Sequence, residues 1–352
     1  MSSLRTGVFA GLAIVLILGV IAVGAVVIVR NTSVLAGWID EPVKLRPVND
    51  EPEAQAKQAL PQVWEHYVNF VQYPVDGFED VLRSRLRHRQ FDDLESFAND
   101  IRSKKTRVKG GRWLLKFFYD AIEEPAAGSG VDDKGWRDHF SLIEEWKTKY
   151  PKSITTRVVD AKSMVVYAWK ARTNKFAPAV SDAQWKLFYE RLGTAKNILV
   201  GSRDLGETCP GWYSAMLTIG NGGGSEPDDY MGIFNQAMEF EPTYDSFYYQ
   251  MSVYWFPQWH GKKGEWAAVL SDVVRKQGTD EAYAMLEMTY DAVLMYDYDF
   301  EEIVPELQQY WPQIKRGFHA PDQLYKVTQG DMNGFTHMAY IAGDRDETRA
   351  MF

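Results

Sequence analysis

Residues 210–254 read PGWYSAMLTIGNGGGSEPDDYMGIFNQAMEFEPTYDSFYYQMSVY, and this stretch decides the fold class of the chain. Pro210-Gly-Trp-Tyr213 opens a helix expected to run to Gly220, and a second helix follows from Tyr230 to Met238. Pro242-Thr-Tyr244 then opens a further helix, 32 residues after the first proline. Two segments of the chain therefore look like copies of one helical unit.

The offset of 32 residues is close to the ~34-residue period of tetratricopeptide repeats, in which a helix pair carries aromatic and small residues and ends at a proline. Trp212 and Tyr213 on the first helix, with Phe234 and Ala237 on the second, suit that pattern. A helix pair cannot bury both of its faces alone, so neighbouring pairs stack and leave a concave surface. We expect a tetratricopeptide-like α-α solenoid.

Upstream of this stretch the apolar residues recur at intervals of three and four, which is typical of helices. The runs lie at 91–101, 113–122, 136–146, 155–172 and 181–205. Turn signals separate them at Gly110-Gly111, Pro125 to Gly130 and Pro151, with Ser181-Asp182 as a cap and Gly206 as a stop. No sustained period-two run is bounded by hairpin turns, so the sequence predicts an all-α fold.

The N-terminus holds an uninterrupted apolar segment, Gly7 to Val29, with no charge and no proline. At ~1.5 Å per residue it would span roughly 34 Å, enough for a ~30 Å hydrocarbon core. A cleaved secretory signal is the alternative, although its apolar region normally has only ~7–15 residues. We expect a single transmembrane helix.

The predicted organisation is a short head at 1–6, the transmembrane helix at 7–29, a proline- and acid-rich linker at 30–61 and a soluble helical-repeat domain at 62–352. Arg5 and Arg30 flank the span, which gives only a slight preference for a cytoplasmic N-terminus. The soluble domain is therefore expected outside the cytoplasm, in the periplasm or an equivalent extracytoplasmic space, with the cytoplasm as the alternative.

The chain has a formal net charge of −9, and its first 30 residues carry two arginines and no acid. The soluble part is therefore still more acidic, which disfavours a nucleic-acid partner.

Several short motifs resemble those of a bacterial family of unknown function with tetratricopeptide-like helices. They are Phe91-Asp-Asp-Leu-Glu-Ser-Phe97, Trp113-Leu-Leu-Lys-Phe-Phe-Tyr119, Trp146 to Ser153, Val166-Tyr-Ala-Trp-Lys-Ala-Arg172, Ala237-Met-Glu-Phe-Glu-Pro-Thr-Tyr244, Phe256-Pro-Gln-Trp-His-Gly261 and Ala342-Gly-Asp-Arg-Asp346. The resemblance runs from about Val63 to the C-terminus and departs from the repeat at the glycine-rich 220–225. It implies helical repeats and brings no catalytic set with it.

Motifs for metal, nucleotide or nucleophilic chemistry do not stand out. The six histidines are scattered, and the single cysteine, Cys209, precedes Pro210 and reads as an inert thiol that is buried or semi-buried. Asp297 to Glu302 alternates acids like a calcium loop but lacks its glycine and final glutamate, so an acidic turn is expected there. Asn221 to Glu226 reads as a glycine-rich loop without the ending of a phosphate-binding loop. We predict no catalytic residue, no metal and no cofactor.

The most unusual local chemistry lies in residues 254–266, YWFPQWHGKKGEW. An aromatic platform beside a cationic rim would suit a peptide carboxylate, a sugar or a partner protein, whereas the alternative is that the aromatics pack an inter-helix turn. The candidate partner-binding residues are Trp255, Trp259, His260, Lys262, Lys263 and Trp266.

These features together predict a membrane-tethered helical-repeat protein that serves as a protein-interaction or scaffold subunit, in an envelope or membrane complex. The alternative is a hydrolase acting on an envelope glycan or peptide polymer, with carboxylates in an aromatic-lined cleft near the same tryptophans.

Overall fold

A computed structural model describes residues 75–173, 177–206, 208–294, 304–319 and 329–351. The predicted head, transmembrane segment and linker lie outside these residues, as do the expected start of the folded part near Val63 and the acidic turn at 297–302. Among the helices in the described ranges, none combines the length and hydropathy needed to cross a bilayer.

The described part of the chain is all-α, as the sequence predicts, and its only β-type pairing is a single bridge between Arg107 and Trp113. The first half contains α4 (Val75–Arg87), α5 (Phe91–Ser103), α6 (Leu114–Ile122), α7 (Asp133–Lys149), α8 (Ile154–Arg172), the short 3₁₀ turn η2 (Ala177–Ala179), α9 (Asp182–Val200) and α10 (Arg203–Gly206). The second half contains α11 (Pro210–Gly223), α12 (Pro227–Phe240), α13 (Asp245–Tyr254), α14 (Glu265–Gln277), α15 (Asp280–Leu294), α16 (Val304–His319), α17 (Gln329–Ala342) and α18 (Arg345–Ala350).

Local sequence explains where many of these helices begin. Asp132, Ser153 and Ser181 each accept a hydrogen bond from a backbone N–H three residues later, and Ser181 forms a full capping box with Gln184. Pro210 and Pro227 occupy the first turn of α11 and α12, where a missing N–H costs nothing. The expected cap at Ser181 is thus confirmed.

Two of the boundaries that differ from the sequence prediction have a clear structural cause. The helix expected at 181–205 ends at Val200, because Gly201 caps it and the Ser202 hydroxyl donates to the carbonyls of Ile198 and Leu199. The expected loop at 221–226 is helical as far as Gly223, and α11 ends in the left-handed Gly224. Side chains of Phe188, Leu192 and Trp169 lie within about 3.1–3.3 Å of where a Cβ of Gly222 would be, so close packing overrides its low helix propensity.

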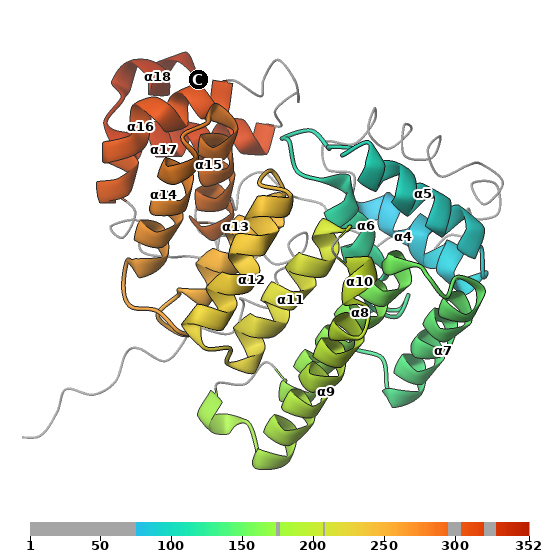
Figure 1. Cartoon of the computed structure of the whole chain (residues 1–352). Helices are drawn as coiled ribbons and strands as arrows, with labels where there is room; N and C mark the ends of the chain where they lie inside the picture. The colour runs from blue at the N-terminus through green and yellow to red at the C-terminus, as the bar shows by residue number, and fades with distance from the viewer. Residues whose placement is uncertain (1–74, 174–176, 207, 295–303, 320–328, 352) are drawn as a thin grey trace, which may run out of the picture.

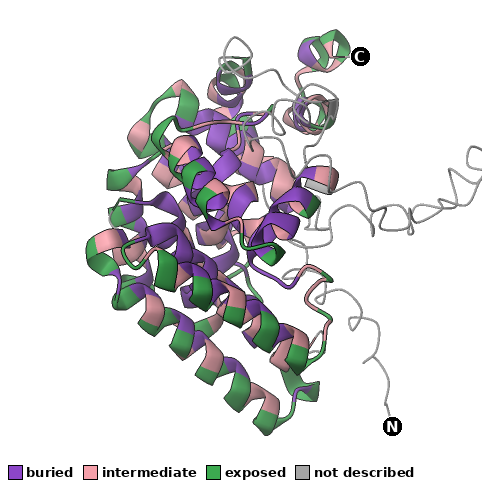
Figure 2. Cartoon of the chain, turned by 90° about the vertical axis from the view of Figure 1, so that its right-hand side faces the viewer, coloured by how far each residue is buried: buried purple, intermediate pink, exposed green. Residues whose placement is uncertain are grey.

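The helices follow one another across the molecule from α4 to α18 (Figure 1). The central helix α8 contacts α6, α7, α9 and α11, and residues around most of its circumference are buried. In the second half α11 packs on α12 and α13, α13 on α14 and α15, α15 on α16 and α17, and α17 on α18. Buried residues gather where helices face one another, while exposed residues follow their outer sides (Figure 2).

The core is continuous from Phe78 on α4 to Ala339 on α17 and is rich in aromatic rings. Trp113, Trp146, Trp212 and Trp266 are among its fully buried side chains. Several are fixed by hydrogen bonds as well as by packing: the indole N–H of Trp212 donates to the Leu199 carbonyl at 2.9 Å, joining α11 to the end of α9.

Candidate functional site

The aromatic segment 254–266 joins α13 to α14, and the structure splits its three tryptophans into two groups. Trp266 lies on α14 with no exposed surface, and its ring contacts Phe256 and Tyr290 edge to face at 5.6 and 5.8 Å. It is therefore a core residue, out of reach of a partner on the folded protein.

Trp255 and Trp259 are only partly buried, in the tight turn after α13. The ring of Trp259 meets Trp169 of α8 edge to face at 5.8 Å. A Cβ at Gly261 would overlap the Trp255 carbonyl, so this turn requires glycine at that position. Both indole N–H groups are inaccessible to water and have no hydrogen-bond acceptor within the described ranges. A buried donor of this kind carries a free-energy penalty until an acceptor reaches it.

The polar members of the segment lie on the surface. His260 is exposed and stacks on Tyr254 at 4.3 Å, and Lys262 and Lys263 are exposed beyond it. The backbone N–H of Lys262 donates to the Glu265 carboxylate at 2.8 Å, which fixes the turn into α14. The structure thus brings five of the six candidate residues together on one turn, which we name the aromatic turn (residues 255–263), and leaves Trp266 in the core.

A second charged site was not anticipated from the sequence. The bridge between Arg107 and Trp113 closes a short hairpin around Gly110 and Gly111, both with positive φ. This hairpin reaches the second half of the chain: Lys105 pairs with Glu241 at 2.6 Å, and Arg107 pairs with Glu281 of α15 at 3.4 Å.

Trp113 anchors the same hairpin. Its backbone N–H donates to Asp245, its indole N–H donates to the Thr243 carbonyl at 2.8 Å, and its ring meets Tyr244 edge to face. Each end of the hairpin is therefore held by residues about 130 positions further along the chain.

Next to the hairpin, three acids from two helices lie close together, and we name this group the carboxylate junction: Glu287 and Asp291 of α15 and Asp331 of α17. Burial, reinforced by the other two carboxylates, places the pKa of Glu287 well above its usual value, against the opposing charge of Arg112 in the hairpin. Burial also raises the pKa of Asp291 to about 6 against the opposing charge of Arg112.

Sequence spacing gives a partial signal for the junction. Glu287 falls four residues before Asp291 and directly after the apolar run from Ala282 to Leu286. An acid at such a position is unusual. Its neighbours Asp331 and Arg112 lie far away in sequence, so only the fold shows that the charges meet.

A third group of charges is buried between α6 and α8. Asp120 accepts hydrogen bonds from Lys116 and Lys162, each at 2.6 Å, and Lys162 also pairs with Glu123 at 2.8 Å. Burial would lower the pKa of Lys162, but Asp120 and Glu123 outweigh it and raise the value. Burial raises the pKa of Glu123 to about 7. These groups satisfy one another, which marks the network as a structural joint between two helices.

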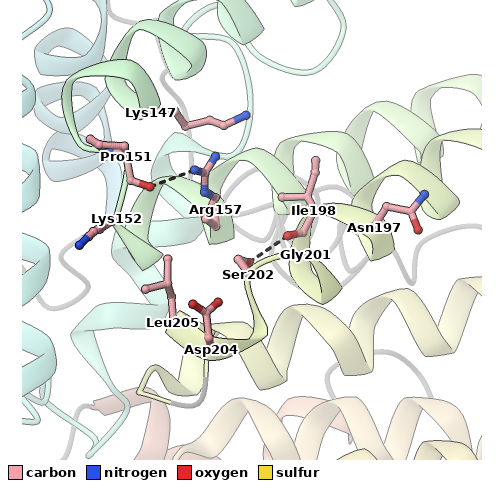
Figure 3. Close-up of a pocket in the computed structure, with 10 residues that line it drawn as sticks. All are labelled: Lys147, Pro151, Lys152, Arg157, Asn197, Ile198, Gly201, Ser202, Asp204 and Leu205. Carbon is pink, nitrogen blue, oxygen red and sulfur yellow. Dashed lines mark hydrogen bonds between the residues drawn. The ribbon is translucent and has the colours of Figure 1, made fainter.

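A groove of about 560 Å³ lies where the ends of α7, α9 and α10 meet the start of α8 (Figure 3). Its polar groups are largely engaged with the protein: Lys147 bonds Asp160 and Glu144, and Arg157 donates to the Pro151 carbonyl. Asp204 lines the opposite side, across from Arg157.

Among the described residues, no group of three or more His, Cys, Asp or Glu side chains is arranged to hold a metal ion. Cys209 is buried just before α11, and its thiol lies 3.3 Å from the Tyr119 hydroxyl. That position agrees with the expectation of a buried thiol.

Comparison with known proteins adds no family to this geometry: no family model, no curated protein and no solved structure matches the chain.

Proposed function

We propose that this protein is a membrane-tethered helical-repeat scaffold that binds a partner protein through the aromatic turn. The proposal combines the apolar segment at 7–29, the acidic linker and the array of helices in the second half.

One contact in particular supports the proposal that the second half consists of helical repeats. Ser214 on α11 and Ser246 on α13 are 32 residues apart, the same offset as the two prolines that open the predicted copies, and their hydroxyls lie 2.7 Å from each other. Equivalent positions of neighbouring repeats are expected to face each other when helix pairs stack in register. The contacts of α11, α13, α15 and α17 continue this order along the chain, in support of a tetratricopeptide-like solenoid.

The aromatic turn has the chemistry of a docking surface. Two partly exposed indole rings, with buried N–H donors that lack an acceptor among the described residues, lie beside the exposed Lys262 and Lys263. Aromatic residues at the centre with charges at the rim are typical of energetically important interface residues. The cationic rim favours an acidic segment of the partner, since complementary charge speeds association.

The hydrolase alternative needs ionisable carboxylates in an open cleft beside the tryptophans. Trp266 is in the core, and of the two acids on α15 with raised pKa values Glu287 is buried and Asp291 is partly buried. These positions favour protein interaction over hydrolysis as the function.

The test is site-specific photo-cross-linking of the full chain in its native membranes. A cross-linking residue at position 260 should capture one defined protein, and the Lys262→Glu and Lys263→Glu double variant should lose that product. The matched control is a cross-linker at position 186, an exposed lysine on α9. Equal capture from positions 260 and 186, or an unchanged product in the double variant, would exclude the aromatic turn as the docking surface.

A further inference from the structure

The carboxylate junction joins three elements that are far apart in sequence. Asp291 of α15 lies against Gly334 of α17, and Asp331 of α17 lies 2.6 Å from where a Cβ of Gly110 in the hairpin would be. Glu287 of α15 is only 4% exposed, and its Oε1 atom has no hydrogen-bond partner within the described residues. Two of these acids thus lie at contacts that position α17, one against α15 and one against the hairpin, and the third is buried within electrostatic reach of both.

The charge balance at the junction is unfavourable when Glu287 and Asp291 are both ionised. The charged groups that act on Glu287 are Asp291 on its own helix, Asp331 from α17 and Arg112 from the hairpin. Glu306 of the adjacent α16 acts on Tyr290 instead. Among the described residues, Arg112 is the cation that acts on both Glu287 and Asp291, and a buried carboxylate oxygen without a hydrogen bond is costly to leave charged.

We propose that the junction is a proton-operated clasp: proton uptake by Glu287 and Asp291 seats α17 against α15 and the hairpin, and proton loss releases it. The ligand of this site is the proton itself. In the repeat array the clasp would control whether the last helices, α17 and α18, stay stacked on α15 and α16. The inference is independent of the partner proposed for the aromatic turn.

Protonation of Glu287 and Asp291 favours the folded protein. Both carboxyl groups hold their protons more tightly in the folded protein than in the unfolded chain. Their contribution to stability is therefore complete below the unfolded-state pKa and is lost as the pH rises through the folded-state pKa. For Asp291 that loss falls between about pH 4 and pH 6, and for Glu287 it extends to higher pH.

The experiment is hydrogen–deuterium exchange of the full chain in detergent at pH 5 and pH 8, corrected for intrinsic exchange rates. We expect peptides of α17 to open at least about tenfold more often at pH 8, since each pH unit between the unfolded-state and folded-state pKa changes the opening equilibrium about tenfold. Glu287→Gln keeps the shape and removes the charge, so at pH 8 it should restore the protection seen at pH 5.

Asp291→Asn supplies a second variant in case the first does not fold, and it should shift the protection of α17 in the same direction. The control Glu190→Gln changes an exposed acid on α9 and should leave α17 unaffected. Equal corrected protection of α17 at both pH values in the unaltered chain would overturn the proposal. So would unchanged protection at pH 8 in both junction variants.

Discussion

Asp291 of α15 rests on Gly334 of α17 so closely that a Cβ atom at position 334 would overlap its Oδ1 atom. The two helices can approach at this point only because residue 334 has no side chain. Glycine in a helix interior costs about 0.5–1 kcal/mol relative to alanine, so the contact between α15 and α17 must offset that cost.

Gly334→Ala should therefore destabilise the protein, because the new methyl group pushes Asp291 away from its place in the carboxylate junction. The matched control is Gly232→Ala in α12, where no atom lies within 4 Å of the added Cβ. That variant should gain up to about 1 kcal/mol from better helix propensity. Thermal unfolding of both variants measures the difference, and a shift of the same sign in each would show that the contact has no energetic role.

The charged network between α6 and α8 predicts a strong asymmetry between buried and exposed lysines. Lys162→Met should cost about 3–5 kcal/mol of unfolding free energy, because Glu123 and Asp120 lose a buried counter-ion. Lys134→Met, which breaks an exposed pair with Asp138, should lower the free energy of unfolding far less, because water screens the charges of that pair. Urea unfolding gives both values. Equal losses would mean that water screens the network.

Much of this fold could be predicted from the sequence because its signals are local. The runs at 91–101, 113–122 and 136–146 became α5, α6 and α7, since their apolar spacing and flanking turns act within a few residues. The helical conformation of Asn221 to Gly223 could not be predicted in this way. It depends on contacts with α8 and α9, which the local sequence does not record.

The candidate sites also divide into features that the local sequence predicts and features that depend on how the helices pack. The aromatic turn is contiguous in sequence and could be selected from its composition, but burial of Trp266 depends on α15, since Tyr290 covers it. The carboxylate junction draws Arg112, Glu287 and Asp331 from three places in the chain. No spacing rule connects such residues without knowledge of which helices pack together.

The buried Trp266 and the partly exposed Trp259 of segment 254–266 should respond differently to substitution. Trp266→Ala should lower the free energy of unfolding by about 3–5 kcal/mol, the usual range for removing a large core aromatic residue. Trp259→Ala should lower the free energy of unfolding by clearly less, since Trp259 is only partly buried. Circular dichroism melts of both variants test this, and a smaller loss at position 266 than at 259 would contradict its assignment to the core.

The predicted anchor can be checked independently of the folded part. The full chain should stay with the membrane after alkaline carbonate extraction, because 23 apolar residues are long enough to cross a bilayer. A chain lacking residues 1–30 should be released. Mass spectrometry of the intact protein decides between an anchor and a cleaved signal, since a mature N-terminus at Gly37, after the small-residue stretch Val34-Leu35-Ala36, would rule out the anchor.

His139 gives a pH dependence opposite in sign to that of the carboxylate junction. Burial lowers the pKa of this side chain to about 4, and its Nε2 atom lies 3.0 Å from the Ser163 hydroxyl. The neutral ring is favoured in the fold, so its contribution is complete above the unfolded-state pKa of about 6.5 and is lost as the pH falls towards 4.

His139→Gln should remove that part of the acid sensitivity, which amounts to at most about 3 kcal/mol for a shift of this size. Urea unfolding at pH 7 and pH 4.5 measures it, with His260→Gln on the exposed aromatic turn as the control. If the stability of the His139→Gln variant falls as steeply with acid as that of the unaltered chain, the buried imidazole is not the group that titrates. Because His139 lies on α7 and the carboxylate junction on α15 and α17, exchange measured separately on these helices keeps the two opposite pH effects apart.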